Sequence, residues 1–310
     1  MIEQYTRYDH LFQNVKPQAV GGIKIFTEHD SSEISQKYEE ITLEEREIWK
    51  RLFDRLIQPL DKYASKEYLV GLQELKLSSG RWPKFHELSQ RIDAETGWQL
   101  QPVAGFLNEY LFFQLNSQRR FPVTDIIRQS RRFEQKYAGQ TVQNRDEYTP
   151  EPDIFHDVRG HCPLLMNKPY SDFLAEIGQL GFDLITDKYE LGPELVAHNL
   201  KRLQNFAWWS YEFGVMKKQD DSLHYRQTPN DMDHEIYGSG IISSYDEVMN
   251  VVVCSRGESD VSRLLPFDIE EVVLTRFDYS DIQDRYYVID SMEDLYATFH
   301  DNRGLFLYKG

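Results

Sequence analysis

Apolar residues along this chain recur mainly at helical spacing. Thr42 begins the strongest predicted helix, because Glu45 three residues later completes a capping box. Apolar residues between Ile48 and Ile57 then repeat every three or four positions, as on one face of a helix. The same pattern predicts two short helices within residues 64–95 and single helices at residues 173–184 and 195–215.

Strand patterns are few and short. Trp98 begins an extended stretch, which turns at residues 102–105 and continues as a helix toward Phe113. Residues 121–123 are also predicted to be extended, and the aromatic and β-branched residues 286–289 form the best late strand. The predicted fold class is therefore mainly α with small β elements.

Polar stretches mark the connections. Residues 129–148 and residues 217–235 are rich in charged and polar side chains, which predicts two long insertions. Residues 1–40 are also polar, and we interpret them as an N-terminal extension. Because no clear linker divides the remainder, we expect residues 41–310 to form a single domain.

Charge and cysteine content limit the partners and the cellular compartment that we expect. The chain carries 35 Lys and Arg against 51 Asp and Glu, a formal net charge of −16, which argues against nucleic acid and an anionic membrane surface as partners. Its two cysteines cannot form a disulfide framework, and the pattern contains no signal peptide or membrane span. We therefore expect a cytoplasmic protein.

Two histidines five residues apart are the clearest candidates for chemistry. On an α-helix, His156 and His161 would point about 140° apart. We therefore expect the helix to end between them, since Gly160 and Pro163 are typical of a helix end. Arg159 is expected to reach solvent or to pair with an acid. Two nearby histidines are more often core or surface residues than ligands, and zinc also accepts such donors.

Glu212 is the best candidate for a third ligand. It follows the Trp208–Trp209 pair in an otherwise apolar stretch, where an acid would be costly to bury without a partner. A surface acid at a helix end is an equally good interpretation. Glu151 and Asp153 could orient a ligand imidazole through its second nitrogen, although helix capping explains each of them as well. Two histidines and one carboxylate would form a facial triad, which leaves metal positions open for oxygen and substrate.

Four segments occur together in one order: residues 102–107, 148–165, 211–214 and 237–244. In this they resemble the biopterin-dependent aromatic amino acid hydroxylases, and above all the short bacterial members. The likeness extends from about Thr42 to Asp301. It implies a mostly helical catalytic domain built around an iron cleft, with Fe(II) held by His156, His161 and Glu212.

The resemblance also implies a cofactor and a substrate site. A tetrahydropterin would bind beside the iron, at Gly105, Leu107 and Phe112, with Phe112 stacked on its ring and Asp157 reaching it through water. Arg128 lies at the distance from Pro102 that the family pattern requires, and would bind the substrate α-carboxylate by a bidentate pair. The remaining substrate-pocket residues implied by the likeness are Thr149, Pro150, Trp208, Phe213, Gly240 and Ser243.

The aromatic content is consistent with an aromatic substrate pocket but is not evidence for one by itself. The chain has 19 Tyr, 18 Phe and 5 Trp, and core packing would explain Trp208 or Phe213 taken alone. Aromatic pocket walls would nevertheless suit an aromatic side chain.

The implied activity is that of a monooxygenase, which uses O2 as a co-substrate to hydroxylate the ring of a free aromatic amino acid. Conversion of L-phenylalanine to tyrosine is the leading expectation, while tryptophan as substrate or meta-hydroxylation of phenylalanine stays open. A non-catalytic metal- or ligand-binding protein of the same fold is an alternative of another class. A zinc hydrolase is a third, with Asp157 as the base beside the metal-bound water.

The sequence departs from the family pattern at one position near the metal. Ala207 stands where the family usually has a tyrosine, which predicts an altered substrate orientation or size preference. The chain also leaves no room for the regulatory domain and tetramerisation helix of the animal enzymes. We therefore expect a monomer whose partner is a small-molecule aromatic amino acid.

Overall fold

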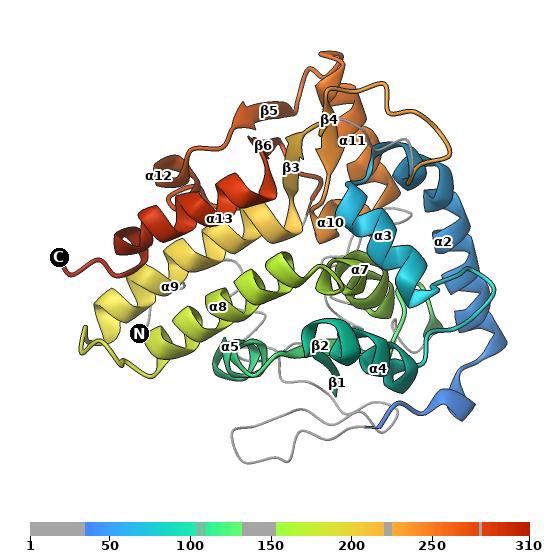
Figure 1. Cartoon of the computed structure of the whole chain (residues 1–310), viewed down its shortest axis with the longest axis horizontal. Coiled ribbons are helices and arrows are strands. Elements are labelled where there is room, and N and C mark those ends of the chain that lie inside the picture. Colours follow the sequence, from blue (N-terminus) through green and yellow to red (C-terminus); the bar gives the residue numbers. More distant parts are fainter. Residues whose placement is uncertain (1–34, 104–106, 108, 132–152, 220–224, 279–280) are drawn as a thin grey trace.

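The computed structural model describes residues 35–103, 107, 109–131, 153–219, 225–278 and 281–310. Gly105, Thr149, Pro150 and Glu151 lie outside these ranges, as does most of the predicted 129–148 insertion. Within the ranges, helices far outweigh strands, so the predicted mainly α fold with small β elements is confirmed (Figure 1). None of the described helices is both long and apolar enough to cross a membrane.

Helices occur along the whole of the described chain. The first half contains η1 (Tyr38–Glu40), α2 (Leu43–Tyr63), α3 (Lys66–Leu75), α4 (Phe85–Thr96), α5 (Glu109–Ser117), η2 (Phe155–His161), α7 (Cys162–Leu165) and α8 (Lys168–Ile185). The second half contains α9 (Pro193–Ala207), η3 (Trp208–Glu212), α10 (Ser239–Ile242), α11 (Tyr245–Ser255), α12 (Ile269–Val272), α13 (Met292–Asp301) and η5 (Arg303–Phe306). Of these, η2 and η3 are π-helices.

Two small sheets lie on opposite sides of the helices (Figure 1). β1 (Gln99–Val103) pairs in parallel with β2 (Arg120–Thr124). The other sheet has the order β4-β3-β6-β5, in which β4 (His234–Ile236) is antiparallel to β3 (Gly214–Lys217), whereas β6 (Arg285–Ile289) is parallel to β3 and to β5 (Arg263–Pro266). The predicted extended segments are therefore confirmed as β1, β2 and β6.

The predicted capping box begins α2. Glu45 N donates to Thr42 Oγ1 at 3.2 Å, and Thr42 N donates to Glu45 Oε2 at 2.8 Å. Five of the six apolar residues that predicted this helix are buried, but Ile57 is 46% exposed. The capping box thus identified the start of α2, and helical spacing identified its buried face.

Close helix packing sets the position of the site. α8, α9 and α13 lie side by side (Figure 1), with Phe173, Phe206 and Phe299 in mutual ring contact at 5.2–6.2 Å between centroids. On its other side α8 approaches α5, where a Cβ on Gly181 would lie 2.2 Å from the ring of Phe113. Only glycine permits this approach. The packing holds α9 in place, and η3 continues directly from its end.

Candidate metal and substrate site

A π-helix brings the two histidines together. In the π-helix η2 the backbone hydrogen bonds join residues five apart rather than four apart. His156 and His161, which are five apart, therefore lie on the same face of the helix. Their Nε2 atoms lie 3.1 Å apart, and their rings are perpendicular. The prediction that a helix ends between them was wrong. The chain continues into α7, where Pro163 occupies the first turn and needs no helical N–H partner.

A second π-helix presents the carboxylate. Glu212 is the last residue of η3, so the helix predicted at residues 195–215 ends earlier than expected and leads into β3. Glu212 Oε1 lies 3.2 Å from His161 Nε2, and Glu212 Oε2 lies 3.5 Å from His156 Nε2. Ser239 Oγ donates to Glu212 Oε2 at 2.8 Å. Among the described residues, these three form the group of His, Cys, Asp and Glu donors whose ligand atoms all lie within 4.8 Å of one another.

The donor atoms fit a bound cation. Ligands bound at about 2.1 Å would be about 3.0 Å apart at right angles and about 3.4 Å apart in a tetrahedron. The observed separations of 3.1, 3.2 and 3.5 Å are close to these values. Burial lowers the pKa of His156 to about 4. Burial alone would raise the pKa of Glu212, but the two imidazoles and Ser239 outweigh it and hold that pKa at about 2. A neutral imidazole and an ionised carboxylate are the forms that bind metals.

Ser243, and not Asp153, contacts the second nitrogen of His156. Nδ1 lies 2.9 Å from Ser243 Oγ, and with Nε2 turned toward a metal it is the Nδ1–H that donates. Asp153 Oδ1 instead accepts from the backbone N–H of His156 at 2.9 Å. Of the two interpretations of Asp153, the imidazole partner is therefore wrong, whereas the contact to the backbone at the start of η2 agrees with helix capping.

Asp153 has a further partner that sequence reasoning missed. Arg128 Nε and Nη2 donate to its two carboxylate oxygens at 2.9 and 2.8 Å, and Arg128 Nη1 donates to the carbonyl of Ser243 at 3.2 Å. Both ionic side chains are almost fully buried. Burial opposes ionisation of Asp153, but the guanidinium outweighs it and lowers the pKa of that carboxyl. The pair holds Arg128 in a single orientation beside η2 and α10.

Stacked aromatic rings lie at the start of η3. Trp208 stacks on Phe213 with centroids 4.6 Å apart and on Phe277 with centroids 4.2 Å apart. Gly240 makes room for this stack, because a Cβ there would lie 2.8 Å from the ring of Phe213. The structure therefore brings Trp208, Phe213 and Gly240 together. Phe277 had no distinguishing sequence pattern and was missed.

The described residues that were predicted to bind the cofactor lie just before α5, in α5 and in η2. Leu107 is buried with Val103, and Phe112 packs partly buried against the same small cluster. Asp157, in η2, is held by β2: its Oδ2 accepts from the backbone N–H and the hydroxyl of Thr124, at 2.7 and 2.8 Å. Burial raises the pKa of Asp157 to about 7. The acid is thus fixed next in the chain to His156, a candidate metal ligand.

Arg159 does not behave as expected. It is 1% exposed, its guanidinium lies 4.2 Å from the ring centroid of Phe53, and it donates to the hydroxyl of Tyr68. The prediction of solvent or an acidic partner was wrong, because η2 directs this side chain toward α2 and α3, where aromatic faces can accept a cation.

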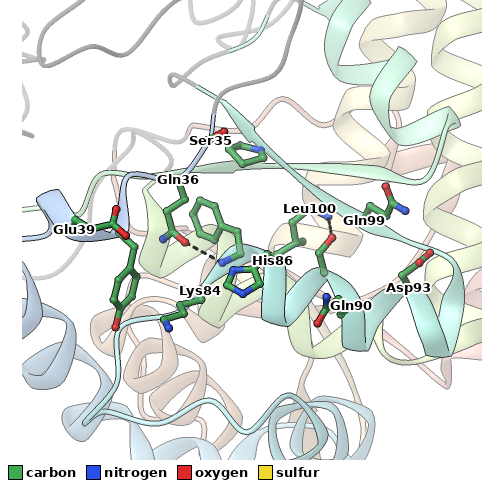
Figure 2. Close-up of a pocket in the computed structure, with 13 residues that line it drawn as sticks. Ser35, Gln36, Glu39, Lys84, His86, Gln90, Asp93, Gln99 and Leu100 are labelled. Carbon is green, nitrogen blue, oxygen red and sulfur yellow. Dashed lines mark hydrogen bonds between the residues drawn. The ribbon is translucent and has the colours of Figure 1, made fainter.

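A separate hollow of about 590 Å³ lies between η1, α4 and β1 (Figure 2). Its lining includes Lys84, His86, Asp93 and Gln99. None of the three clustered donors lines it. The chemistry described above is therefore located elsewhere in the domain.

Two histidines and a glutamate beside stacked aromatic rings are typical of non-haem iron oxygenases. The chain belongs to a particular family of that class: the model of the biopterin-dependent aromatic amino acid hydroxylases matches residues 28–302. Membership confirms the predicted family, its pterin-dependent hydroxylase activity and its iron and pterin cofactors.

Known relatives and solved structures agree with this assignment. The phenylalanine-4-hydroxylase of Chromobacterium violaceum is 30% identical over 282 residues, covering 90% of this chain and 82% of that protein. That of Caulobacter vibrioides is 31% identical, covering 84% and 76%. The structure of the Chromobacterium violaceum enzyme with bound iron(III) and 7,8-dihydrobiopterin superposes with a TM-score of 0.71 at 28% identity, covering 90% of this chain and 87% of that one. The predicted closeness to short bacterial enzymes is confirmed.

Proposed function

We propose that this protein hydroxylates the ring of free L-phenylalanine to give tyrosine, with Fe(II), a tetrahydropterin and O2. The observation that carries the proposal is the convergence of His156, His161 and Glu212, in a chain whose relatives include several phenylalanine-4-hydroxylases. When bound, iron and reduced pterin together supply the activation of oxygen.

Three side chains would hold the iron. His156 and His161 supply neutral nitrogen donors and Glu212 supplies the negative charge, all from one side. Ser243 fixes the ring of His156 through Nδ1, so that Nε2 is presented as the donor. The convergence of two imidazole nitrogens and a carboxylate on one point is physical support for a metal at this position.

Arg128 would bind the substrate carboxylate. Asp153 accepts two hydrogen bonds from the guanidinium and balances its charge within the buried site. A fixed guanidinium orients a carboxylate at little entropic cost. Trp208, Phe213 and Gly240 would form the pocket wall, with Thr149 and Pro150 completing it.

A tetrahydropterin would bind along the segment that contains Gly105, Leu107 and Phe112. Phe112 offers a partly buried aromatic face for stacking. Asp157 would hold a water on the pterin side of η2, with its carboxyl position set by Thr124. The role of these residues is to keep the cofactor close to the metal and to exclude bulk water.

Ala207 bears on the ring position that is hydroxylated. It directly precedes η3 and is only partly buried. A methyl group in place of a larger side chain leaves space in which a substrate ring can rotate or a larger ring can enter. Tryptophan and meta-hydroxylation are therefore the two alternatives within this chemistry.

The test is aerobic turnover with Fe(II) and a tetrahydropterin, using each of the three aromatic amino acids. Mass spectrometry identifies the products, and ring-deuterated phenylalanine reports the position attacked. His156→Ala is the control, and Co(II) absorption measures metal binding apart from activity. Tyrosine as the main product supports the proposal. Stoichiometric zinc, with no response to iron and pterin, would instead favour the hydrolase.

The remaining features of the proposal concern the protein as a whole. We expect residues 41–310 to act as one catalytic domain and the protein to be a cytoplasmic monomer that binds no nucleic acid. Its net charge of −16 and its two free cysteines support the setting. Light scattering during size-exclusion chromatography measures the oligomeric state, and a mass of twice 36.8 kDa would contradict the monomer.

A further inference from the structure

The stack around Trp208 is held by one hydrogen bond at its polar edge. The indole Nε1 of Trp208 donates to Gln283 Oε1 at 3.2 Å. Both residues are buried, with Gln283 only 3% exposed. Nothing in the sequence distinguished Gln283, which lies 75 residues away in the chain.

The side-chain amide of Gln283 has only one satisfactory orientation. Its Nε2 donates to the carbonyls of Asp278 at 2.6 Å and Asp281 at 2.9 Å. If the amide were flipped, its oxygen would face these two carbonyl oxygens and its NH2 would face the indole N–H. The two carbonyls therefore direct Oε1 toward Trp208.

The backbone of Gln283 is equally constrained. Its N–H donates to Glu247 Oε1 at 3.0 Å. Its carbonyl accepts from Asn250 Nδ2 at 3.1 Å and from Ser262 Oγ at 3.0 Å. Glu247 and Asn250 both belong to α11, so that helix anchors the residue from behind.

Gln283 also connects two members of the aromatic stack. Phe277, which stacks on Trp208, immediately precedes Asp278, whose carbonyl accepts from Gln283. One side chain thus fixes both the indole of Trp208 and the backbone that carries Phe277.

We infer that Gln283 is a positioning residue that determines which aromatic amino acid the enzyme prefers. The inference rests on the proposed function, in which Trp208 forms a wall of the substrate pocket. Gln283 acts on the substrate only through that indole. Replacing Gln283 removes the hydrogen bond that orients the indole, and the ring can then move to the position that each substrate requires.

The kinetic test compares phenylalanine and tryptophan as substrates. In Gln283→Leu, KM for phenylalanine rises at least fivefold, kcat falls less than KM rises, and the ratio of kcat/KM for phenylalanine to that for tryptophan changes at least fivefold. Affinity for Co(II) stays within twofold, because Glu212 lies at the other end of η3. A merely structural role would lower kcat/KM equally for both substrates, and that outcome overturns the inference.

A double-mutant cycle isolates the route through the indole. In a Trp208→Phe background there is no indole N–H, so adding Gln283→Leu leaves the substrate ratio unchanged within twofold. An equal change in both backgrounds would show that Gln283 acts by another route and would refute the inference.

A spectroscopic measurement separates this inference from the proposed function. In protein labelled with 15N-tryptophan, the indole signal lost in Trp208→Phe shifts in Gln283→Leu. The Trp209 signal does not shift, since its Nε1 donates to the carbonyl of Thr275 at 2.9 Å. Wild-type protein that hydroxylates none of the amino acids defeats the proposed function. Turnover with an unmoved Trp208 signal defeats only the role of Gln283.

Discussion

Replacing Ser243 by alanine tests the support of the metal site with little disturbance elsewhere. The change removes Oγ, which lies 2.9 Å from His156 Nδ1, and leaves in place the backbone carbonyl that accepts from Arg128. Among the residues that the structure describes, the other hydrogen bond of this hydroxyl is a long one to the carbonyl of Gly240, at 3.4 Å. The substitution therefore acts chiefly on the orientation and tautomer of one ligand.

The expected effect is on metal affinity rather than on folding. Loss of the partner of a metal-bound histidine typically weakens metal binding by about 10–100-fold, or about 1.4–2.8 kcal/mol. Removing the buried hydroxyl costs the metal-free protein about 1 kcal/mol, which for a chain of this size lowers Tm by only about 2–4 °C.

The assay is a competition between the protein and a chelator for Fe(II) or Co(II), with thermal unfolding of the metal-free protein measured in parallel. Ser244→Ala is the matched control. Ser244 is also buried, but its hydroxyl accepts from Glu247 N at 3.3 Å as the N-cap of α11, so this variant loses stability and keeps its metal affinity. If Ser243→Ala binds metal within twofold of the wild type, the reasoning is wrong.

Three further predictions concern stability and substrate binding. Burial raises the pKa of Glu247 from 4.5 to about 8, so its contribution to the free energy of unfolding is present below pH about 4.5 and is lost as pH rises toward 8, on the order of 5 kcal/mol in all. Urea unfolding of Glu247→Gln should therefore show a shallower decline in stability from pH 6 to 8, and an unchanged slope would contradict this. Gly181→Ala, which forces a Cβ against Phe113, should cost about 1–3 kcal/mol in thermal unfolding, whereas Gly304→Ala meets no atom within 4 Å and should be neutral; equal losses would count against the packing argument. Asp153→Asn removes the carboxylate charge that balances buried Arg128, and should cost about 3–5 kcal/mol and raise KM for the amino acid at least tenfold. An unaltered KM would argue against the role of Asp153 in orienting that arginine.

Short sequence patterns predicted many of the helices and strands. The capping box at Thr42 depends on four consecutive residues, and such short-range geometry is the same in any protein. Strands β1, β2 and β6 were predicted as extended segments, of which only β6 is a run of aromatic and β-branched residues. The end of α9 was placed too late, since propensity does not distinguish an α-helix from the π-turns of η3 that follow it.

The sequence also identified the candidate metal ligands, although it did not predict how they are arranged in space. His156 and His161 were chosen in spite of their spacing, which on an α-helix separates them, and the π-helix η2 removes that difficulty. The hydrogen-bond partners of the histidine and arginine side chains at the site were not predicted from the sequence. Ser243 was assigned to the substrate pocket, and Asp153 to an imidazole rather than to Arg128.

By itself the sequence determined the class of fold, the family and the identities of the three donor side chains. These follow from periodicity and from motifs that keep their order along the chain. Only the tertiary structure decided that Glu212 meets both histidines, that Arg159 faces aromatic rings and that Gln283 holds Trp208. Contacts between residues far apart in the chain depend on how helices pack and where a helix widens, and neither is encoded in local spacing.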